Sequence, residues 1–136
     1  MELHLGRLID HVHIVVSDLE KSRKFYKAIL ESIGKSLNNG DAHHFGSDEI
    51  FVTQATETSK LSHIHLAFQV PDHETVQAFH KAAIGAGGTE NGAPGERPYD
   101  PGYYAAFILD PDGNNIEAVF HGPAERSAES ILITPK

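Results

Sequence analysis

The sequence predicts an α+β fold in which two βαβββ modules close one shared sheet. Three observations predict it: strand, helix and further strands follow one another twice, a shift of 54 residues superposes the two halves, and 136 residues fit one domain. Neither module alone could bury both faces of its sheet, so we expect a common core. Within this single domain, 1–136, module one spans about 8–56, module two about 62–121, and a C-terminal tail 122–136.

The first module begins with a strand over residues 8–16, a stretch rich in β-branched residues that partly alternates with polar ones. A helix follows, capped by Ser17 or Asp18, with apolar residues at three-to-four spacing, and Gly34 stands where a C′ glycine ends a helix. Turn chemistry at 38–40 and 46–48 then separates three short strands, expected around 36–37, 42–46 and 49–55.

The second module repeats this order. A strand over 63–70 leads into a helix that opens at Pro71-Asp72 and ends at the glycines Gly85, Gly87 and Gly88. A Gly/Pro-rich loop over 92–102 precedes strands at 103–109 and 115–120, which the turn at 110–114 joins. The 54-residue shift places His65 on His11, Asp72 on Asp18 and Gly88 on Gly34, and matching the later strands places Glu117 on Phe51.

Composition excludes several classes of function. Eleven Lys and Arg against 19 Asp and Glu give a net charge of −8, which argues against nucleic-acid binding. The absence of cysteine excludes thiolate metal sites, so any metal must bind His, Asp or Glu. No apolar run approaches the roughly 20 residues that span a bilayer, and the N-terminus lacks the features of a signal peptide. We therefore expect a cytoplasmic protein without membrane contact.

Two His-x-His pairs occupy equivalent strands of the modules. Because residues i and i+2 of a strand share a face, His11 points with His13, and His63 with His65. The alternative is that these imidazoles are solvated or hydrogen-bonded. Glu117 stands in an apolar strand, where an inward carboxylate needs a partner or a metal; the alternative is that it points to solvent. Two imidazoles and one carboxylate suit a catalytic divalent ion.

Three stretches resemble the vicinal-oxygen-chelate superfamily, which includes glyoxalase I, bleomycin-resistance proteins, extradiol dioxygenases and fosfomycin-modifying thiol transferases. They are Asp-His-Val-His-Ile-Val-Val-Ser-Asp-Leu-Glu-Lys-Ser-Arg-Lys-Phe-Tyr (10–26), His-Leu-Ala-Phe (65–68) and Asp-Pro-Asp-Gly-Asn-Asn-Ile-Glu (110–117). The resemblance covers residues 8–121. It implies a cupped mixed sheet with the helices outside, and His11, His65 and Glu117 as ligands of one zinc, manganese, iron or nickel ion.

Phe51 stands where glyoxalase I carries a fourth ligand, a glutamate. Losing that carboxylate removes a proton-moving group, which argues against glyoxalase I activity itself. His13 or His63 is then the nearest candidate for a general base; the alternative for both is filling or polar packing. Members of the family with one module pair commonly build the cavity across or beside a subunit contact, so we expect a homodimer. The apolar segment 130–134 would be covered by the partner; the alternative is that it covers the chain's own sheet edge.

The cavity wall is expected to include Phe51 and residues of the long Gly/Pro-rich loop and of the start of the strand expected at 103–109. Arg97 would pair with an anionic ligand, and Tyr99 or Tyr104 would supply a ring and a hydroxyl; the alternative is a stiff surface connection. Because adjacent strand residues face opposite ways, at most one of His43 and His44 can line the same cavity.

The favoured function is a metal-dependent, lyase-like or dioxygenase-like enzyme acting on a small oxygenated molecule. The alternative is a metal-free protein that sequesters a small ligand, as bleomycin-resistance proteins do.

Overall fold

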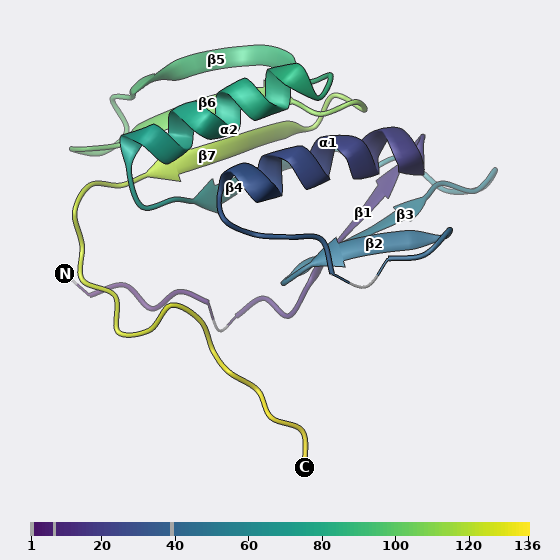
Figure 1. Cartoon of the computed structure of the whole chain (residues 1–136), viewed down its shortest axis with the longest axis horizontal. Coiled ribbons are helices and arrows are strands. Elements are labelled where there is room, and N and C mark those ends of the chain that lie inside the picture. The colour runs from purple at the N-terminus through teal and green to yellow at the C-terminus, as the bar shows by residue number, and fades with distance from the viewer. Residues whose placement is uncertain (1, 7, 39) are drawn as a thin grey trace.

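The computed structural model describes residues 2–6, 8–38 and 40–136, and it has the two-module order (Figure 1). Module one contains β1 (Val12–Val16), α1 (Leu19–Ser32), β2 (His44–Ser47) and β3 (Ile50–Gln54). Module two contains β4 (His65–Gln69), α2 (His73–Gly85), β5 (Thr89–Glu96), β6 (Tyr104–Leu109) and β7 (Asn115–Phe120). The α+β class and the repeated order of elements are confirmed. Neither helix is long and apolar enough to cross a membrane.

The strands form two sheets with the orders β1-β3-β2 and β4-β7-β6-β5. In each sheet the first strand of the module pairs in parallel with the last, and the other pairings are antiparallel. We expected one continuous sheet, whereas the described strands form two separate sheets. The connector before β4 links the sheets locally: the Ser62 N–H donates to the Val15 carbonyl at 3.0 Å, and the Asn115 N–H donates to the Ile64 carbonyl at 3.0 Å. Among the described residues these contacts do not extend into a ladder.

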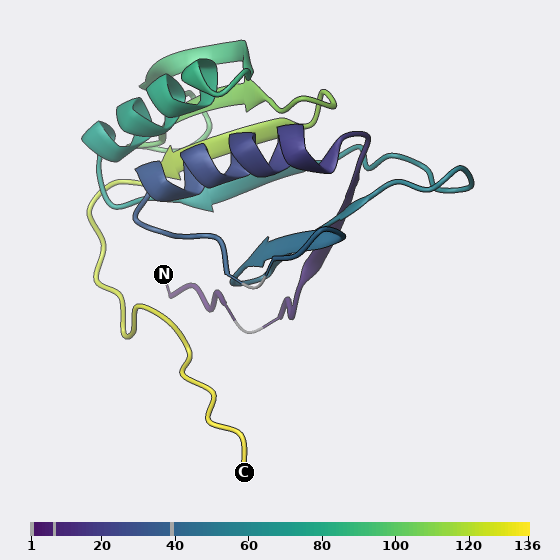
Figure 2. The same ribbon diagram turned by 45° about the vertical axis from the view of Figure 1, so that its right-hand side comes forward.

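The modules share a core because α1 packs against both. Figures 1 and 2 show the two helices side by side on one face of the four-stranded sheet, with α1 nearer the three-stranded sheet. The Tyr26 ring lies 6.0 Å from that of Phe45 on β2, and its hydroxyl donates to Asp110 in the β6–β7 turn at 2.7 Å. The buried cluster accordingly joins side chains of both sheets, such as Ile14 and Ile116. Each sheet therefore has one face in the core and one open face.

Both helices are capped as the sequence predicts, but the glycine that ends the second helix lies one residue earlier than the repeat match places it. The Asp18 and Asp72 carboxylates accept from the N–H groups of Lys21 and Thr75, at 3.0 and 2.8 Å, so both are N-caps. Gly34 has φ +79° and ends α1 as expected. In α2 the corresponding positive φ, +95°, belongs to Gly87, because this helix has 13 residues and α1 has 14. The repeat match of Gly34 with Gly88 is therefore wrong by one residue.

Two strands differ from expectation. β5 runs through Gly92 and Pro94, where a loop was expected; it is an edge strand, and shifts of its register beside Gly92 and Gly95 accommodate these residues. The strand expected at 36–37 is reduced to one bridge between Asn38 and Gly46. The turn predicted at 38–40 includes Asn39, which lies outside the described residues.

Candidate functional site

The open face of the four-stranded sheet carries His65, Phe107 and Glu117 side by side. Glu117 on β7 pairs with Phe107 on β6 and with Ala67 on β4, two residues beyond His65. Ile116, the residue before Glu117, belongs to the core on the other face. Strand alternation thus aims Glu117 away from the helices and toward His65.

Glu117 is a buried carboxylate with two partners. It is 1% exposed, so its charge needs compensation. His65 Nε2 lies 2.7 Å from Oε2, and the Tyr103 hydroxyl donates to Oε1. Burial and the hydrogen bond to Glu117 raise the pKa of the Tyr103 phenol above its ordinary value, so the phenol stays protonated and can donate at neutral pH. The solvent-facing alternative for Glu117 does not apply.

Tyr103 is a site residue that the sequence did not single out. Its ring meets the rings of Tyr99 and His121 edge-on, with centroids 5.0 and 4.9 Å away. Tyr104 was expected to line the cavity, and this placement needs correction. It lies on the opposite face, stacked on His73 at 3.8 Å, with its hydroxyl accepting from Gln77 at 3.1 Å. Neighbouring residues of a strand point to opposite faces, so only one of the two tyrosines can reach Glu117.

Residues 96–103 form a surface pocket of about 380 Å³ beside this cluster, lined among others by Arg97, Tyr99 and Tyr103. The Arg97 guanidinium lies 5.3 Å from the Phe107 ring centroid and donates to the Ala93 carbonyl at 2.7 Å. Arg97 and Tyr99 therefore lie near the His65–Glu117 pair.

The open face of the three-stranded sheet carries a second group of imidazoles. Phe51 is 36% exposed there, and its ring centroid lies 5.0 Å from that of His13 and 5.5 Å from that of His44. His13 Nε2 lies 2.8 Å from Thr53 Oγ1. His11, His44 and Phe51 contribute to the lining of a pocket of about 390 Å³. Of the neighbouring pair 43 and 44, His44 is the one on this face.

The structure brings together two of the three expected ligands. His65 and Glu117 meet, whereas His11 is exposed and lies 2.6 Å from Asp10 through Nδ1. Within residues 2–6, 8–38 and 40–136, no three His, Asp or Glu side chains form a group that could hold a metal. Among the described residues, the three expected ligands therefore do not meet within one chain. His63, the other candidate for a base, is exposed just before β4.

The His65–Glu117 pair fits a divalent ion in its chemistry but not in its number of donors. Imidazole nitrogen and carboxylate oxygen suit zinc, manganese, iron and nickel. A catalytic site normally has three protein ligands. To hold a divalent ion, these two residues would need at least one further protein donor.

Residues 8–118 match the family model described as the Glyoxalase/Bleomycin resistance protein/Dioxygenase superfamily. The match covers most of the chain, which therefore belongs to this superfamily. No curated protein matches the chain significantly.

Solved structures of this kind share the fold. A glyoxalase/bleomycin resistance protein from Albidiferax ferrireducens T118 is 32% identical, with 82% of this chain and 98% of that chain covered and a TM-score of 0.73. A family enzyme from Burkholderia phytofirmans PsJN is 25% identical, with coverages of 81% and 95% and a TM-score of 0.63. A glyoxalase I mutant from Zea mays is 25% identical, with coverages of 82% and 45% and a TM-score of 0.60.

Proposed function

We propose that this protein is a divalent-metal-dependent enzyme of the superfamily that acts on a small oxygenated molecule. The observation that carries the proposal is the buried Glu117 carboxylate facing His65 on an open sheet face. Burying a carboxylate costs free energy, and ionisable groups in such costly surroundings cluster at functional sites. When bound, the ion supplies polarisation of paired substrate oxygens and stabilisation of developing negative charge.

The third ligand, His11, would come from a second copy of the chain. Each chain carries two half-sites: His65 and Glu117 on one sheet, and His11 with Phe51 on the other. A two-fold dimer that places unlike faces together would complete two identical sites. This arrangement explains why the three residues share a motif pattern and yet do not meet in one chain.

The remaining side chains have roles that follow from their positions. Arg97, held over Phe107, would pair with an anionic group of the substrate, and Tyr99 would offer a ring at the same rim. Phe51 would form an apolar wall. His13, whose Nε2 is hydrogen-bonded to Thr53, would accept or hold a proton, with His63 as the other candidate. A lyase-like or dioxygenase-like reaction suits this set, and the absence of a glutamate at 51 disfavours glyoxalase I activity.

A metal-free ligand-sequestering protein is the second candidate. The observation that favours it is that His65 Nε2 and Glu117 Oε2 lie 2.7 Å apart, so each gives the other a hydrogen-bond partner. In that case the aromatic pocket at residues 96–103 would hold the ligand, and the imidazoles would be polar lining.

Metal analysis separates the candidates. Protein purified without chelator and supplied with zinc should hold about one ion per chain, His65→Ala and His11→Ala should hold none, and His43→Ala should match wild type. His43 is exposed and its N–H donates to Asp41 at 2.7 Å, so it serves as a control for loss of a histidine. Wild-type protein that takes up no ion supports sequestration instead.

Mixing the two defective variants tests the shared site. After unfolding and refolding together, half of the dimers should be mixed, and each mixed dimer contains one intact site and one doubly defective site. The mixture should therefore recover about a quarter of the wild-type metal content. Recovery of none, while wild type binds zinc, would place the site within one chain.

A further inference from the structure

Arg97 is held in a fixed position on the open face of the four-stranded sheet. Its guanidinium donates to the Ala93 carbonyl at 2.7 Å and to the Glu96 carbonyl at 3.2 Å, and it lies 5.3 Å from the centre of the Phe107 ring. Its own main-chain N–H donates to the Tyr103 carbonyl at 2.9 Å. Because main chain and side chain are both anchored, a ligand that binds this cation does not have to order a flexible side chain.

Two glycines of β5 provide the space that the guanidinium occupies. A Cβ on Gly92 would lie 3.2 Å from Arg97 Nη2, and a Cβ on Gly95 would lie 3.1 Å from Arg97 Nη1. Both distances are shorter than the optimal separation of non-bonded heavy atoms, so a side chain at either position would push the guanidinium away. Glycine weakens a strand and often marks a place where another group approaches closely. In β5 the approaching group is the side chain of Arg97.

The charge of Arg97 has no carboxylate partner among the described residues. An arginine side chain has five N–H donors, and the bonds to the two main-chain carbonyls leave three of them without an acceptor in the described part of the chain. The nearby Glu117 carboxylate already accepts from Tyr103 and faces His65. A half-buried, unpaired cation in a chain of net charge −8 indicates that an anionic ligand binds there.

The pocket of about 380 Å³ that Arg97 lines has aromatic walls. Tyr99 is 62% exposed, and its ring meets the ring of Tyr103 at 83° with the centroids 5.0 Å apart, so the two rings form a corner. Aromatic walls with a few placed polar groups are typical of small-molecule sites, and a volume of this size suits one small ligand. A flat ring can pack against this corner while an acidic group on it reaches Arg97.

The charges around the pocket favour a singly charged anion. Glu96 and Asp100 are exposed, and Arg97 is the one cationic side chain among the described residues that line the pocket. A phosphate would bring a larger negative charge toward the two carboxylates. A carboxylate is planar and matches the arginine fork through two parallel N–H···O bonds.

We propose that this pocket binds a small aromatic carboxylate, with the carboxylate on Arg97 and the ring against Tyr99. The inference names the substrate class of the proposed function and rests on that function for what happens to the ligand. Binding itself uses the guanidinium and the tyrosine rings and needs no metal.

Binding of benzoate to metal-free protein tests the proposal. In calorimetric titrations wild type should bind benzoate, and Arg97→Ala should bind it about tenfold or more weakly, because hydrogen bonds to charged groups are lost. Arg97→Lys keeps the charge without the planar fork and should also bind weakly. Arg126→Ala is the matched control: Arg126 lies in the tail and donates to Gln69, so its loss should leave the affinity for benzoate unchanged.

Probes that share the ring and differ in charge test the chemical class. Benzyl alcohol, benzylamine and phenyl phosphate should each bind wild type more weakly than benzoate does. Tyr99→Ala should weaken benzoate binding by about two- to tenfold through loss of ring contact. It should leave the melting temperature unchanged, because the Tyr99 side chain is largely exposed. The order of the probes is measured on wild type, so it does not depend on how well any variant folds.

Three results overturn the proposal: no binding of benzoate by wild type, an unchanged affinity in folded Arg97→Ala, or stronger binding of benzylamine or phenyl phosphate than of benzoate. Zinc uptake without benzoate binding overturns this inference alone. Benzoate binding without zinc uptake overturns the metal-dependent function alone, and makes the pocket that of a sequestering protein.

Discussion

Ser22 is fully buried on α1, and its hydroxyl has no hydrogen-bond partner among the described residues. Burying an unpaired hydroxyl costs free energy, and serine is a weaker helix former than alanine. Ser22→Ala should therefore raise the free energy of unfolding by roughly 1 kcal/mol in urea titrations. Ser32→Ala is the matched control on the same helix, because the Ser32 hydroxyl donates to the Ile29 carbonyl at 2.6 Å. Stabilisation by both changes would show that helix propensity alone is responsible.

Tyr26 joins the modules through one buried hydrogen bond, from its hydroxyl to Asp110 Oδ2 at 2.7 Å. Tyr26→Phe should lower the free energy of unfolding by about 1.5–3 kcal/mol, because the bond goes to a charged group. Burial, and next the negative charge of Asp110, raise the pKa of the Tyr26 phenol above its ordinary 10.0.

The raised pKa of Tyr26 predicts a pH dependence. Below pH 10 the phenol is protonated in both states, so its stabilising contribution is complete. Above pH 10 the unfolded phenol ionises while the folded one stays protonated, so the contribution falls as pH rises. The difference in free energy of unfolding between wild type and Tyr26→Phe should thus shrink above pH 10. Tyr103 is present in both proteins and cancels; a difference independent of pH would contradict the prediction.

Phe51 lies on the same open face as His13 and His44. If this face meets the His65–Glu117 face of a partner, Phe51→Glu should add a ligand, so that saturating zinc raises the melting temperature of the variant more than that of wild type. Without zinc, the variant should be the less stable protein, because the added carboxylate is unpaired. Equal stabilisation of both proteins by zinc would show that Phe51 does not face the ion.

At the scale of elements, the approach of α1 to β6 depends on Gly88. A Cβ at this position would lie 2.5 Å from Ile108 Cγ2 and 2.8 Å from both Phe25 Cε2 and the Ala83 carbonyl oxygen. Two of these neighbours are core side chains and one is backbone, so little can move aside.

Gly34 provides the comparison, because it has φ +79° and a Cβ at this position would meet no heavy atom within 4 Å. Gly34→Ala should cost about 1 kcal/mol from backbone strain alone, whereas Gly88→Ala should cost about 2–3 kcal/mol from overpacking. Urea unfolding of both variants measures the two losses. A smaller loss for Gly88→Ala would mean that the modules separate there at little cost.

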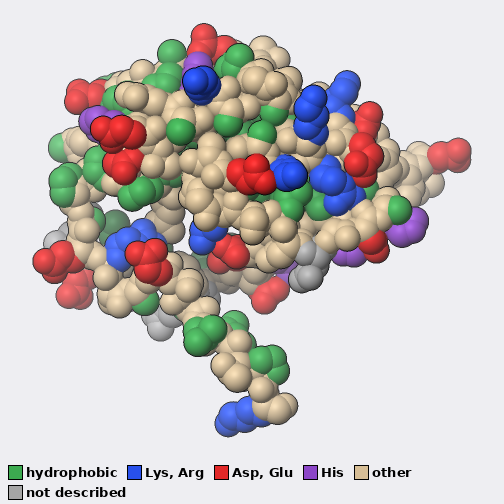
Figure 3. All heavy atoms as spheres, viewed as in Figure 1, with side chains coloured by type: hydrophobic (Ala, Val, Ile, Leu, Met, Phe, Trp, Pro, Cys, Tyr) green, Lys and Arg blue, Asp and Glu red, His purple; other side chains and the backbone are tan. Residues whose placement is uncertain are grey.

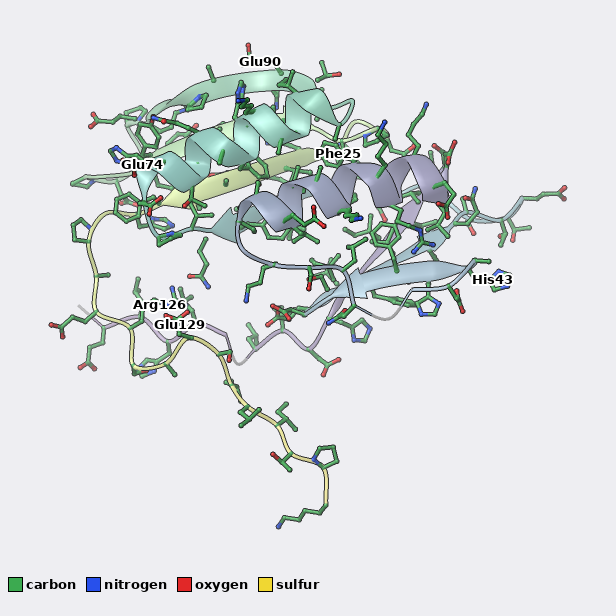
Figure 4. All side chains as sticks on the ribbon, in the orientation of Figure 1. Phe25, His43, Glu74, Glu90, Arg126 and Glu129 are labelled. Carbon is green, nitrogen blue, oxygen red and sulfur yellow. The ribbon has the colours of Figure 1, made fainter. Side chains whose placement is uncertain are left out.

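At the scale of the whole molecule, both chain ends expose apolar side chains. The N-terminal segment exposes Leu3, Leu5, Leu8 and Ile9, and the tail exposes Ile131, Leu132 and Ile133. Arg126 ties the tail to β4 by donating to Gln69 at 2.7 Å, and Figure 4 labels Arg126 and Glu129 along it. Figure 3 shows hydrophobic side chains on the part that projects beyond them. A partner subunit would remove these side chains from water.

We therefore expect light scattering to give twice the 14.8 kDa of one chain at micromolar concentration and above. Removal of residues 130–136 should shift dissociation to higher protein concentration, because it deletes part of the apolar surface. A mass of 14.8 kDa at high concentration would reject the dimer, and with it the shared metal site.

The sequence by itself determined what depends on neighbours along the chain. Asp18 and Asp72 cap the helices and Gly34 ends the first one, because caps need only residues within a few positions. The repeat and the motif at 110–117 also predicted that His65 and Glu117 lie together, and the parallel pairing of the first and last strands of the second module brings them within 2.7 Å.

Only the tertiary structure decided which residues of different segments meet. Tyr103, and not Tyr104, is the tyrosine that contacts Glu117. The face on which a strand residue lies depends on the residue at which the strand begins, and the Gly/Pro-rich loop before this strand makes that residue impossible to predict from the sequence. The tertiary structure also kept His11 away from Glu117. The position of one module relative to the other depends on how α1 fills the space between two sheets, and no spacing along the sequence encodes that packing.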